Sequence, residues 1–228
     1  MKVAIHQPNF IPWLGYFNKI HLADCFVFLD NVQFEKQDFG NRNRIKTPEG
    51  EKWLTLPIKI KGKSTQLINE CEIHDTSKTL HKITRMIECN YRRAPYFSKY
   101  FLGLSEILKS GDTQMVSLNM QIIDWACDIF GIDTKFIVAS KLQGITESGN
   151  ARNVQICKAV GATEYISGSG ARDYNDSDSF ERAGVKLVYS EFVSPEYSQC
   201  FGPFIPNLSF LDYLFNEGAD FFRGMSKI

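Results

Sequence analysis

The stretch "KVAIHQPNFIPWLGYFNKIHLADCFVFLD", residues 2–30, decides the fold. It begins with a short apolar run, passes through a loop with two prolines, and ends in a second apolar run closed by an acid. This pattern predicts a strand over 2–6, a helix over 12–23 with Pro12 in its first turn, and a buried strand over 25–30. Two parallel strands joined by a helix form half of a nucleotide-binding fold, and the loop after the first strand opens at the edge where such folds bind ligands.

The rest of the chain predicts one α/β domain over residues 1–228. In the polar segment 34–75, "EKWLTLPIKI" and "QLINECEI" alternate like strands, and "KIKGKS" between them is typical of a hairpin turn. Three helical segments follow over 77–131, and strands alternate with helices again after Thr134. We therefore expect a mostly parallel, Rossmann-like sheet of the nucleotidylyltransferase type, with a β-hairpin flap and a mid-chain helical insertion.

Composition excludes several classes of protein. The 26 basic residues match the 26 acidic ones, so no overall field attracts nucleic acid or an anionic membrane, and we expect neither as a partner. No apolar run approaches the roughly 20 residues that span a bilayer, and the N-terminus lacks the apolar segment of a secretory signal. These features predict a cytoplasmic protein without membrane insertion.

The six cysteines are scattered singly, without a CxxC pair or a nearby histidine at a metal-ligand spacing. We expect no metal site. Most cysteines lie in apolar runs, so buried, inert thiols are predicted, with Cys200 as the exposed exception.

Three polar clusters stand at predicted strand ends or in loops, and each could have a purely structural role as well as a functional one. The first cluster holds His6, Gln7, Asn9, Trp13 and Tyr16. The second holds Asp30, Asn31, Gln33, Asn41, Arg42, Asn43 and Arg44. The third, "SGSGARDY", holds Ser167, Gly168, Ser169, Gly170, Arg172 and Tyr174. Carboxyl ends of parallel strands meet at one sheet edge, which predicts that the three clusters converge on one crevice.

The third cluster has the composition of an anion cradle. Glycines let backbone N–H groups approach a phosphate, the two serines add hydroxyl donors, and Arg172 adds positive charge. The chain contains no Walker loop, no GxGxxG at the first strand, and no HExxH, GxSxG or EF-hand signature. Metalloprotease, serine hydrolase and calcium-sensor functions are therefore not predicted.

Six segments, in order along nearly the whole chain, resemble the WbqC-like family of bacterial proteins. They are "HQPNFIPWLGYFNKI", "FLDNVQF", "NRNRIKT", "YISGSGARDY", "PEYSQ" and "LSFLDYLFNEG". Members of that family are associated with O-antigen and other surface-polysaccharide clusters and are described as glycine or acyl transferases. The resemblance thus implies a transferase of this pathway.

A more distant likeness links the chain to nucleotidylyltransferases and pantothenate synthetase. "WLGY" occupies the position of their HxGH motif, and "ISGSGAR" the position of a later "ISGT" segment with Arg. Trp13 and Tyr16 thus replace both histidines, which contact the phosphates of ATP in those enzymes. The likeness implies the fold, whereas this departure argues against their ATP chemistry.

These observations lead to a main hypothesis of a transferase that attaches a small acyl or aminoacyl group to the amine of a nucleotide-linked amino sugar. His6 is the predicted general base, because an imidazole pKa near 6.5 suits that role, and Asp30 orients it or the amine. Gln7 and Asn43 are assigned to the carbonyl oxygen. The predicted substrate-binding residues are Asn9, Trp13, Tyr16, Gln33, Asn41, Arg42, Ser167, Gly168, Ser169, Gly170, Arg172 and Tyr174.

Two alternatives stay open: an ATP-dependent ligase or nucleotidylyltransferase of the same pathway, and a non-catalytic sugar-nucleotide-binding protein. The acyl donor is equally open among acyl-CoA, an acyl carrier protein, an amino acid with ATP, and an aminoacylated tRNA. The sequence names neither the sugar nor the oligomeric state.

Overall fold

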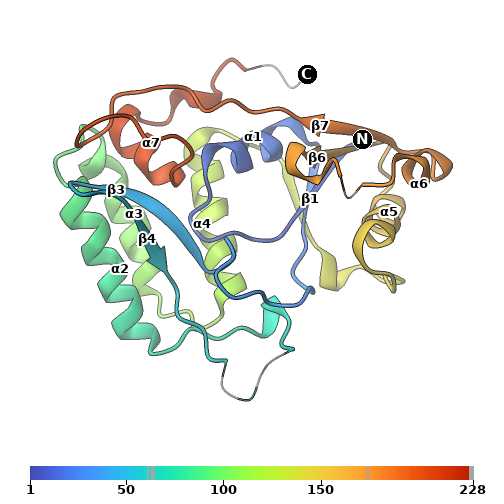
Figure 1. The fold of residues 1–228 in the computed structure, drawn as a ribbon, viewed down its shortest axis with the longest axis horizontal. Helices are drawn as coiled ribbons and strands as arrows, with labels where there is room; N and C mark the ends of the chain where they lie inside the picture. The colour runs from blue at the N-terminus through green and yellow to red at the C-terminus, as the bar shows by residue number, and fades with distance from the viewer. Residues whose placement is uncertain (61, 63–64, 174, 226–228) are drawn as a thin grey trace.

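The computed structural model describes residues 1–60, 62, 65–173 and 175–225. Its centre is a sheet of five parallel strands in the order β5-β2-β1-β6-β7, which confirms the predicted sheet (Figure 1). The strands are β1 (Lys2–His6), β2 (Cys25–Phe28), β5 (Lys135–Val138), β6 (Glu164–Gly168) and β7 (Lys186–Ser190).

Strand β1 lies in the middle of the sheet, with β2 on one side and β6 on the other. Val3 is in register with Cys25 on β2 and with Tyr165 on β6. The chain therefore leaves β1 in one direction and returns on its other side, which makes the boundary between β1 and β6 a topological switch point. Open α/β sheets bind ligands in the crevice at this place, outside the carboxyl ends of the strands.

Helices cover both faces of the sheet because side chains alternate along each strand. Ala4 and Phe26 belong to the larger core, which they share with α1 (Leu14–Leu22) and α4 (Met115–Phe130). Val3 and Val27 belong to a smaller core on the opposite face. That face is covered by α5 (Gly149–Ala159) and α6 (Ser177–Arg182) (Figure 1).

Helix α1 begins two residues after the predicted start, at Leu14, with Trp13 as its N-cap. The preceding loop turns sharply at Ile11, where φ is 37°, so Pro12 stays outside the helix. Nearly every residue of α1 is buried, because sheet, α4 and the C-terminal segments surround it.

The mid-chain segment holds α2 (Thr76–Tyr91), α3 (Phe97–Lys109) and α4. Helix α4 ends as predicted at Gly131, whose φ of 70° is a left-handed conformation that glycine adopts without strain. Helix α7 (Phe210–Glu217) packs beside α3 (Figure 1). Short 3-10 helices complete the fold: η1 (Ile68–Glu70), η2 (Ala139–Lys141), η3 (Ser169–Ala171) and η4 (Asp220–Phe222).

The predicted β-hairpin is present, but its strands are not "EKWLTLPIKI" and "QLINECEI", which meet only at an isolated bridge between Ile58 and Ile73. Strand β4 (Gly50–Thr55) pairs instead with β3 (Arg42–Thr47), antiparallel, and "QLINECEI" forms η1 and isolated bridges. The polar sequence of β3 does not indicate a strand, because the buried face of β3 includes Asn43 as well as Ile45. Residues 61 and 63–64 of the predicted turn lie outside the described residues.

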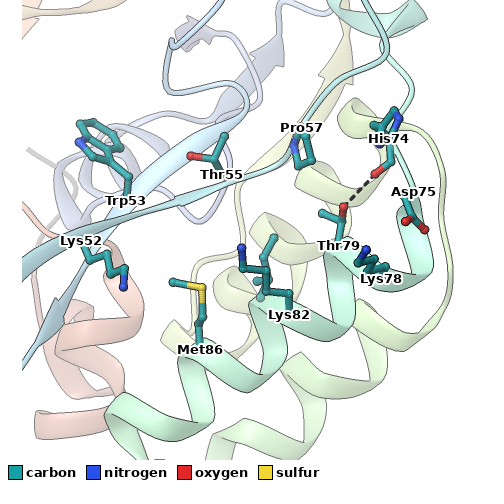
Figure 2. Close-up of a pocket in the computed structure, with 11 residues that line it drawn as sticks. Lys52, Trp53, Thr55, Pro57, His74, Asp75, Lys78, Thr79, Lys82 and Met86 are labelled. Carbon is teal, nitrogen blue, oxygen red and sulfur yellow. Dashed lines mark hydrogen bonds between the residues drawn. The ribbon is translucent and has the colours of Figure 1, made fainter.

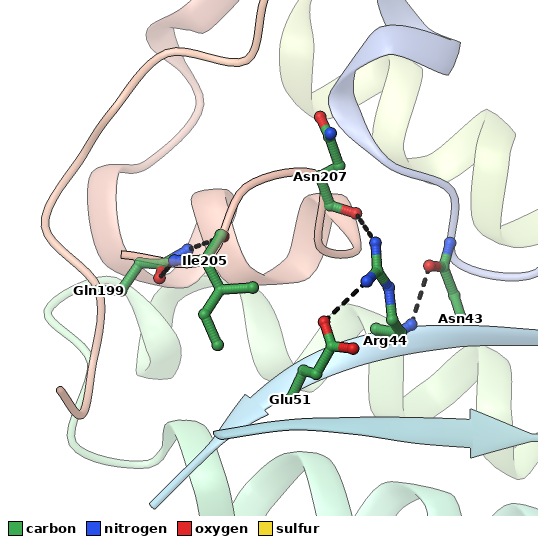
Figure 3. A network of polar contacts seen from close by, with 6 residues as sticks. All are labelled: Asn43, Arg44, Glu51, Gln199, Ile205 and Asn207. Atoms are coloured by element: carbon green, nitrogen blue, oxygen red, sulfur yellow. Dashed lines mark hydrogen bonds and ion pairs between the residues drawn. The ribbon is translucent and has the colours of Figure 1, made fainter. Parts of the chain in front are cut away.

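After β7, residues 191–208 run without helix or strand across α1 to α7, and we call them the return segment (Figure 1). Arg44 fixes its far end by donating to Asn207 O at 3.4 Å and to Glu51 at 2.7 Å (Figure 3). Gln199 braces the segment internally, because it exchanges two hydrogen bonds of 2.9 Å with the backbone of Ile205 (Figure 3).

Within the described part of the chain, no helix combines the length and the apolar character that crossing a membrane requires.

Candidate functional site

A small cavity of about 140 Å³ lies at the switch point, and we call it the switch-point cavity. Its walls come from β1 (His6), α1 (Tyr16 and Lys19), the start of η3 (Ser169) and the return segment (Phe192). Pockets for drug-sized ligands usually measure about 300–1,000 Å³. This cavity therefore fits one functional group, such as a phosphate, rather than a whole nucleotide.

His6 is held as a neutral imidazole. Its Nδ1 donates to Gln7 O at 3.1 Å, because a carbonyl can only accept, and Nε2 is left as the acceptor nitrogen. Tyr16 Oη donates to the same carbonyl at 3.0 Å, and its ring meets the imidazole edge-on with centroids 5.0 Å apart. Burial, and then the nearby charge of Lys19, lowers the pKa of His6 to about 3. His6 is thus uncharged at neutral pH.

Lys19 is the functional candidate that sequence reasoning missed. Its side chain is 5% exposed, and Nζ donates to Ile5 O at 3.4 Å. Among the described residues no carboxylate lies within ion-pair distance, and burial alone lowers its pKa to about 7. The carbonyl uses one of three N–H donors of the ammonium, so a ligand in the cavity has two more to accept from. The signal in the sequence is a single lysine on the same helix face as Tyr16, three residues away.

The "SGSG" segment contributes its last three residues to the cavity. Gly168, Ser169 and Gly170 line it, and a Cβ added at either glycine would meet nothing within 4 Å. The space that a side chain would fill at both glycines is therefore open to a ligand. Ser167, in contrast, is buried outside the lining and accepts from Asn175 at 2.9 Å.

Arg172 is turned toward β7 rather than into the switch-point cavity. Its Nη2 donates to Glu191 at 2.6 Å, and its guanidinium lies 4.5 Å from the centre of the Tyr189 ring. Tyr174 lies outside the described residues. Their roles in phosphate binding stay predictions.

Asp30 ties β2 to the end of β5. Its carboxylate accepts from Ser140 N at 2.9 Å, from Ser140 Oγ at 2.6 Å and from Asn69 at 3.4 Å. Gln33 is exposed and forms an isolated bridge with Leu67. The structure thus places both outside the lining of the switch-point cavity.

The asparagines of the first two clusters mainly hold backbone. Asn43 donates to Ile11 O at 2.9 Å and fixes the loop before α1, and Asn41 donates to Leu56 O at 2.9 Å. Asn9 is buried in that loop. Arg42 stacks its guanidinium 4.1 Å from the centre of the Trp53 ring. None of the four lines the switch-point cavity, and their predicted roles in the reaction stay untested.

Trp13 forms the outer wall of the cavity together with Phe192, with ring centroids 5.4 Å apart. A Cβ at Gly15 would lie 2.4 Å from the Trp13 ring, so only glycine lets the indole lie across the start of α1. Tyr16, at the position of the second HxGH histidine, is buried and directs its hydroxyl to Gln7 O.

A second buried polar cluster joins three segments of the family motifs. Asp212 on α7 accepts from Tyr91 at 2.7 Å and from Tyr197 at 2.9 Å. Lys46 on β3 donates to Gln199 at 3.0 Å and to Pro203 O. Burial raises the pKa of Asp212, while hydrogen bonds and the charge of Lys46 oppose that shift. This cluster anchors the return segment to the hairpin and to α7.

The cysteines differ from the prediction in one respect. Cys25, Cys71, Cys127 and Cys157 are buried, as expected, but the exposed thiol is Cys89. Cys200 is half-buried, because the return segment folds back on α7 and its Sγ donates to Asn216 at 3.3 Å.

The structure is that of an α/β protein with a small cavity at the switch point of a parallel sheet. The chain belongs to the WbqC-like protein family, whose sequence model matches residues 7–223. It is 36% identical over 221 residues to the uncharacterized protein Rv1507c of Mycobacterium tuberculosis (strain ATCC 25618 / H37Rv). The matched region covers 96% of this chain and 95% of that protein. No solved structure matches the chain.

Proposed function

We propose that the chain is a transferase that attaches a small acyl or aminoacyl group to the amine of a nucleotide-linked amino sugar in surface-polysaccharide biosynthesis. One observation carries the proposal: the switch-point cavity combines the buried Lys19, without a carboxylate partner among the described residues, and the neutral His6. Membership of the WbqC-like family supports the choice of pathway.

Lys19 explains why the substrate would be anionic. A buried ammonium without a counter-charge is costly, and a phosphate in the cavity would supply that charge. The backbone N–H groups of the "SGSG" segment add donors of the kind that bind phosphate. The remainder of a sugar nucleotide would then extend past Trp13 and Phe192, which line the cavity rim.

His6 would take the proton that the reaction releases. The amine nitrogen attacks the acyl carbonyl, a C–N bond forms, and the bond from the acyl carbon to the donor's leaving group breaks with its electron pair. The amine proton passes to Nε2 of His6 and then to the leaving group. Because the charge of Lys19 helps to lower the pKa of His6, an anion bound beside Lys19 raises that pKa and makes His6 a better base.

One alternative gains from the geometry and the other does not. With a pKa of about 3, His6 is a weak base in the free protein, which favours a non-catalytic sugar-nucleotide-binding protein as the second candidate. An ATP-dependent ligase or nucleotidylyltransferase is less favoured, since Tyr16 directs its hydroxyl to the protein backbone rather than to a ligand.

Binding of UDP-glucosamine, measured by calorimetry at pH 7, tests the first step. We expect Lys19→Met to weaken binding by about tenfold or more, the scale of a lost charge-assisted hydrogen bond. Lys158→Met, which removes an exposed lysine of α5, is the matched control and should bind like the unchanged protein. Absence of binding, or equal binding by both variants, would overturn the proposal.

Turnover tests the second step, with acetyl-CoA, an acyl carrier protein thioester, glycine plus ATP, or glycyl-tRNA as donor and mass spectrometry as readout. We expect His6→Asn to bind UDP-glucosamine normally but to lower kcat about 10²–10⁴-fold. His81→Asn, an exposed histidine on α2, is the control. Binding without turnover from any donor would identify the non-catalytic alternative, and glycine-dependent pyrophosphate exchange would identify the ligase.

A further inference from the structure

A larger cavity, about 490 Å³, lies between β4 and helix α2, and we call it the β4–α2 groove. Lys52 of β4 and Lys82 of α2 point into the same space, with Met86 beside them (Figure 2). Lys78 and Ile83 also line the groove. It shares no lining residue with the switch-point cavity.

The groove exposes an unpaired strand edge. Leu56 N donates to Asn41 O at 2.7 Å, on the β3 side. Because successive residues direct their backbone groups to opposite edges, those of Thr55 and Trp53 face the other side. On that side His74 N donates to Pro57 O at 2.7 Å, and the chain then turns into α2. The ladder stops there, so within the described residues β4 has no second partner strand.

The groove also carries an excess of positive charge. Lys78 and Lys82 are four residues apart on α2, where like charges destabilise each other, and Lys52 faces them from β4. None of the three lysines forms an ion pair with a described residue. Asp75, at the start of α2, is the single acid among the lining residues. In a chain with 26 basic and 26 acidic residues, this local excess calls for an acidic ligand.

We propose that the β4–α2 groove binds an extended acidic segment of a partner protein, which adds to β4 as a third strand. Backbone hydrogen bonds to Trp53 and Thr55 would continue the ladder that His74 begins. In an extended peptide, alternate side chains on one face are about 6.8 Å apart, and residues four apart on a helix rise by about 6 Å. Acidic residues at alternate positions therefore match Lys78 and Lys82, while Met86 and Ile83 contact the apolar part of the peptide.

Two other roles of these lysines are compatible with their place beside a strand edge: protection of the edge, and binding of a small polyanion. Each predicts a different binding result from strand addition. Lysines on an edge strand often prevent pairing with other chains, and Lys52 would then keep peptides away. A small polyanion held by the lysines alone would not need the strand edge. A ligand whose backbone cannot form the ladder distinguishes strand addition from both roles.

The probe is a fluorescently labelled seven-residue peptide in which valine and glutamate alternate, with fluorescence anisotropy of the full chain as readout. We expect saturable binding that Lys78→Gln/Lys82→Gln weakens about tenfold or more, since two charge-assisted contacts are lost. The control Lys141→Gln/Lys158→Gln removes the same charge from exposed lysines elsewhere and should bind normally. Equal binding by both double variants would overturn the proposal, as would no saturable binding at all.

Three further ligands test the mode of binding. A peptide with N-methylated backbone at alternate residues, and one with glutamine in place of glutamate, should each bind about tenfold or more weakly, because one loses ladder hydrogen bonds and the other loses charge. Inorganic pyrophosphate should not compete. Unchanged affinity of the N-methylated peptide, or competition by pyrophosphate at the affinity of the acidic peptide, would overturn strand addition. The lysine variants should bind UDP-glucosamine normally, so this test is independent of the proposed function.

Discussion

Lys19 and His6 line one small cavity, where the charge of Lys19 adds to burial in lowering the pKa of His6. The position of His6 follows from the sequence, because it ends the first strand, where parallel sheets bind ligands. Lys19 could not be recognised in that way. Helix α1 is buried on nearly all sides, so no polar face marks the lysine as either a surface or a site residue. Only the packing of α1 against the sheet places it beside His6.

The stability of the protein should depend on pH through Lys19. Its pKa is about 7 in the folded protein and ordinarily 10.5, so between these values the unfolded chain holds a proton that the folded chain has lost. Unfolding free energy therefore rises with pH in this window, by up to about 1.4 kcal/mol per pH unit. Urea unfolding at pH 6.5, 8 and 9.5 should show that Lys19→Met is more stable than the unchanged protein at pH 6.5. The gap should narrow as pH rises.

Lys158→Met provides the reference for that series, because it removes an exposed lysine from α5. Its stability should follow that of the unchanged protein at every pH. A difference between Lys19→Met and the unchanged protein that stays constant from pH 6.5 to 9.5 would show that Lys19 remains charged after folding.

At the scale of elements, the sequence predicts the alternating strands and helices of the parallel sheet well, but it does not predict which strands form the hairpin. Apolar runs such as "CFVF" mark buried parallel strands directly, and Gly131 marks the end of α4. Strand β3 escapes notice because its inward face includes Asn43, whose amide nitrogen donates to the loop before α1 and whose Oδ1 accepts from Arg44 N. The cluster around Asp212 is likewise not predictable from the sequence. Its members come from segments far apart in the chain and become hydrogen-bond partners only in the folded protein.

The return segment depends on Gln199, which accepts from Lys46 and Ile205 and donates to Ile205 O. Gln199→Ala leaves a buried ammonium and two backbone groups short of partners. We expect a loss of about 1–3 kcal/mol in unfolding free energy, measured in urea, and faster proteolysis within residues 191–208. Gln143→Ala, at an exposed position, is the control. Equal midpoints for the two variants would mean that Gln199 does not brace the segment.

At the scale of the whole molecule, sequence rhythm specifies that the sheet is parallel but not which strands are neighbours. The pairing of β1 with β6 decides that His6 and "SGSG" share a cavity, and it follows from the crossover through α5. The clusters at Asp30 and Asn43 were expected in the same crevice. Their hydrogen bonds instead join β2 to β5 and the hairpin to the loop before α1, which local sequence does not reveal.

Anions should stabilise the whole molecule through the switch-point cavity. A ligand that binds only the folded state at ten times its dissociation constant adds about 1.4 kcal/mol, which raises the melting temperature of a chain this size by roughly 3–6 °C. We expect this rise with inorganic phosphate at constant ionic strength, and its loss in Lys19→Met. The same rise in Lys19→Met would assign the phosphate effect to another part of the protein.

The central position of β1 also has a consequence for synthesis on the ribosome. The first strand made needs β6, which begins at Glu164, to cover one of its edges. At common elongation rates of about 5–20 residues per second, that edge waits roughly 10–30 s for its partner. During this time the nascent chain exposes an apolar strand edge, of the kind that pairs with other chains. A chaperone that shields nascent strands should therefore improve the yield of folded protein.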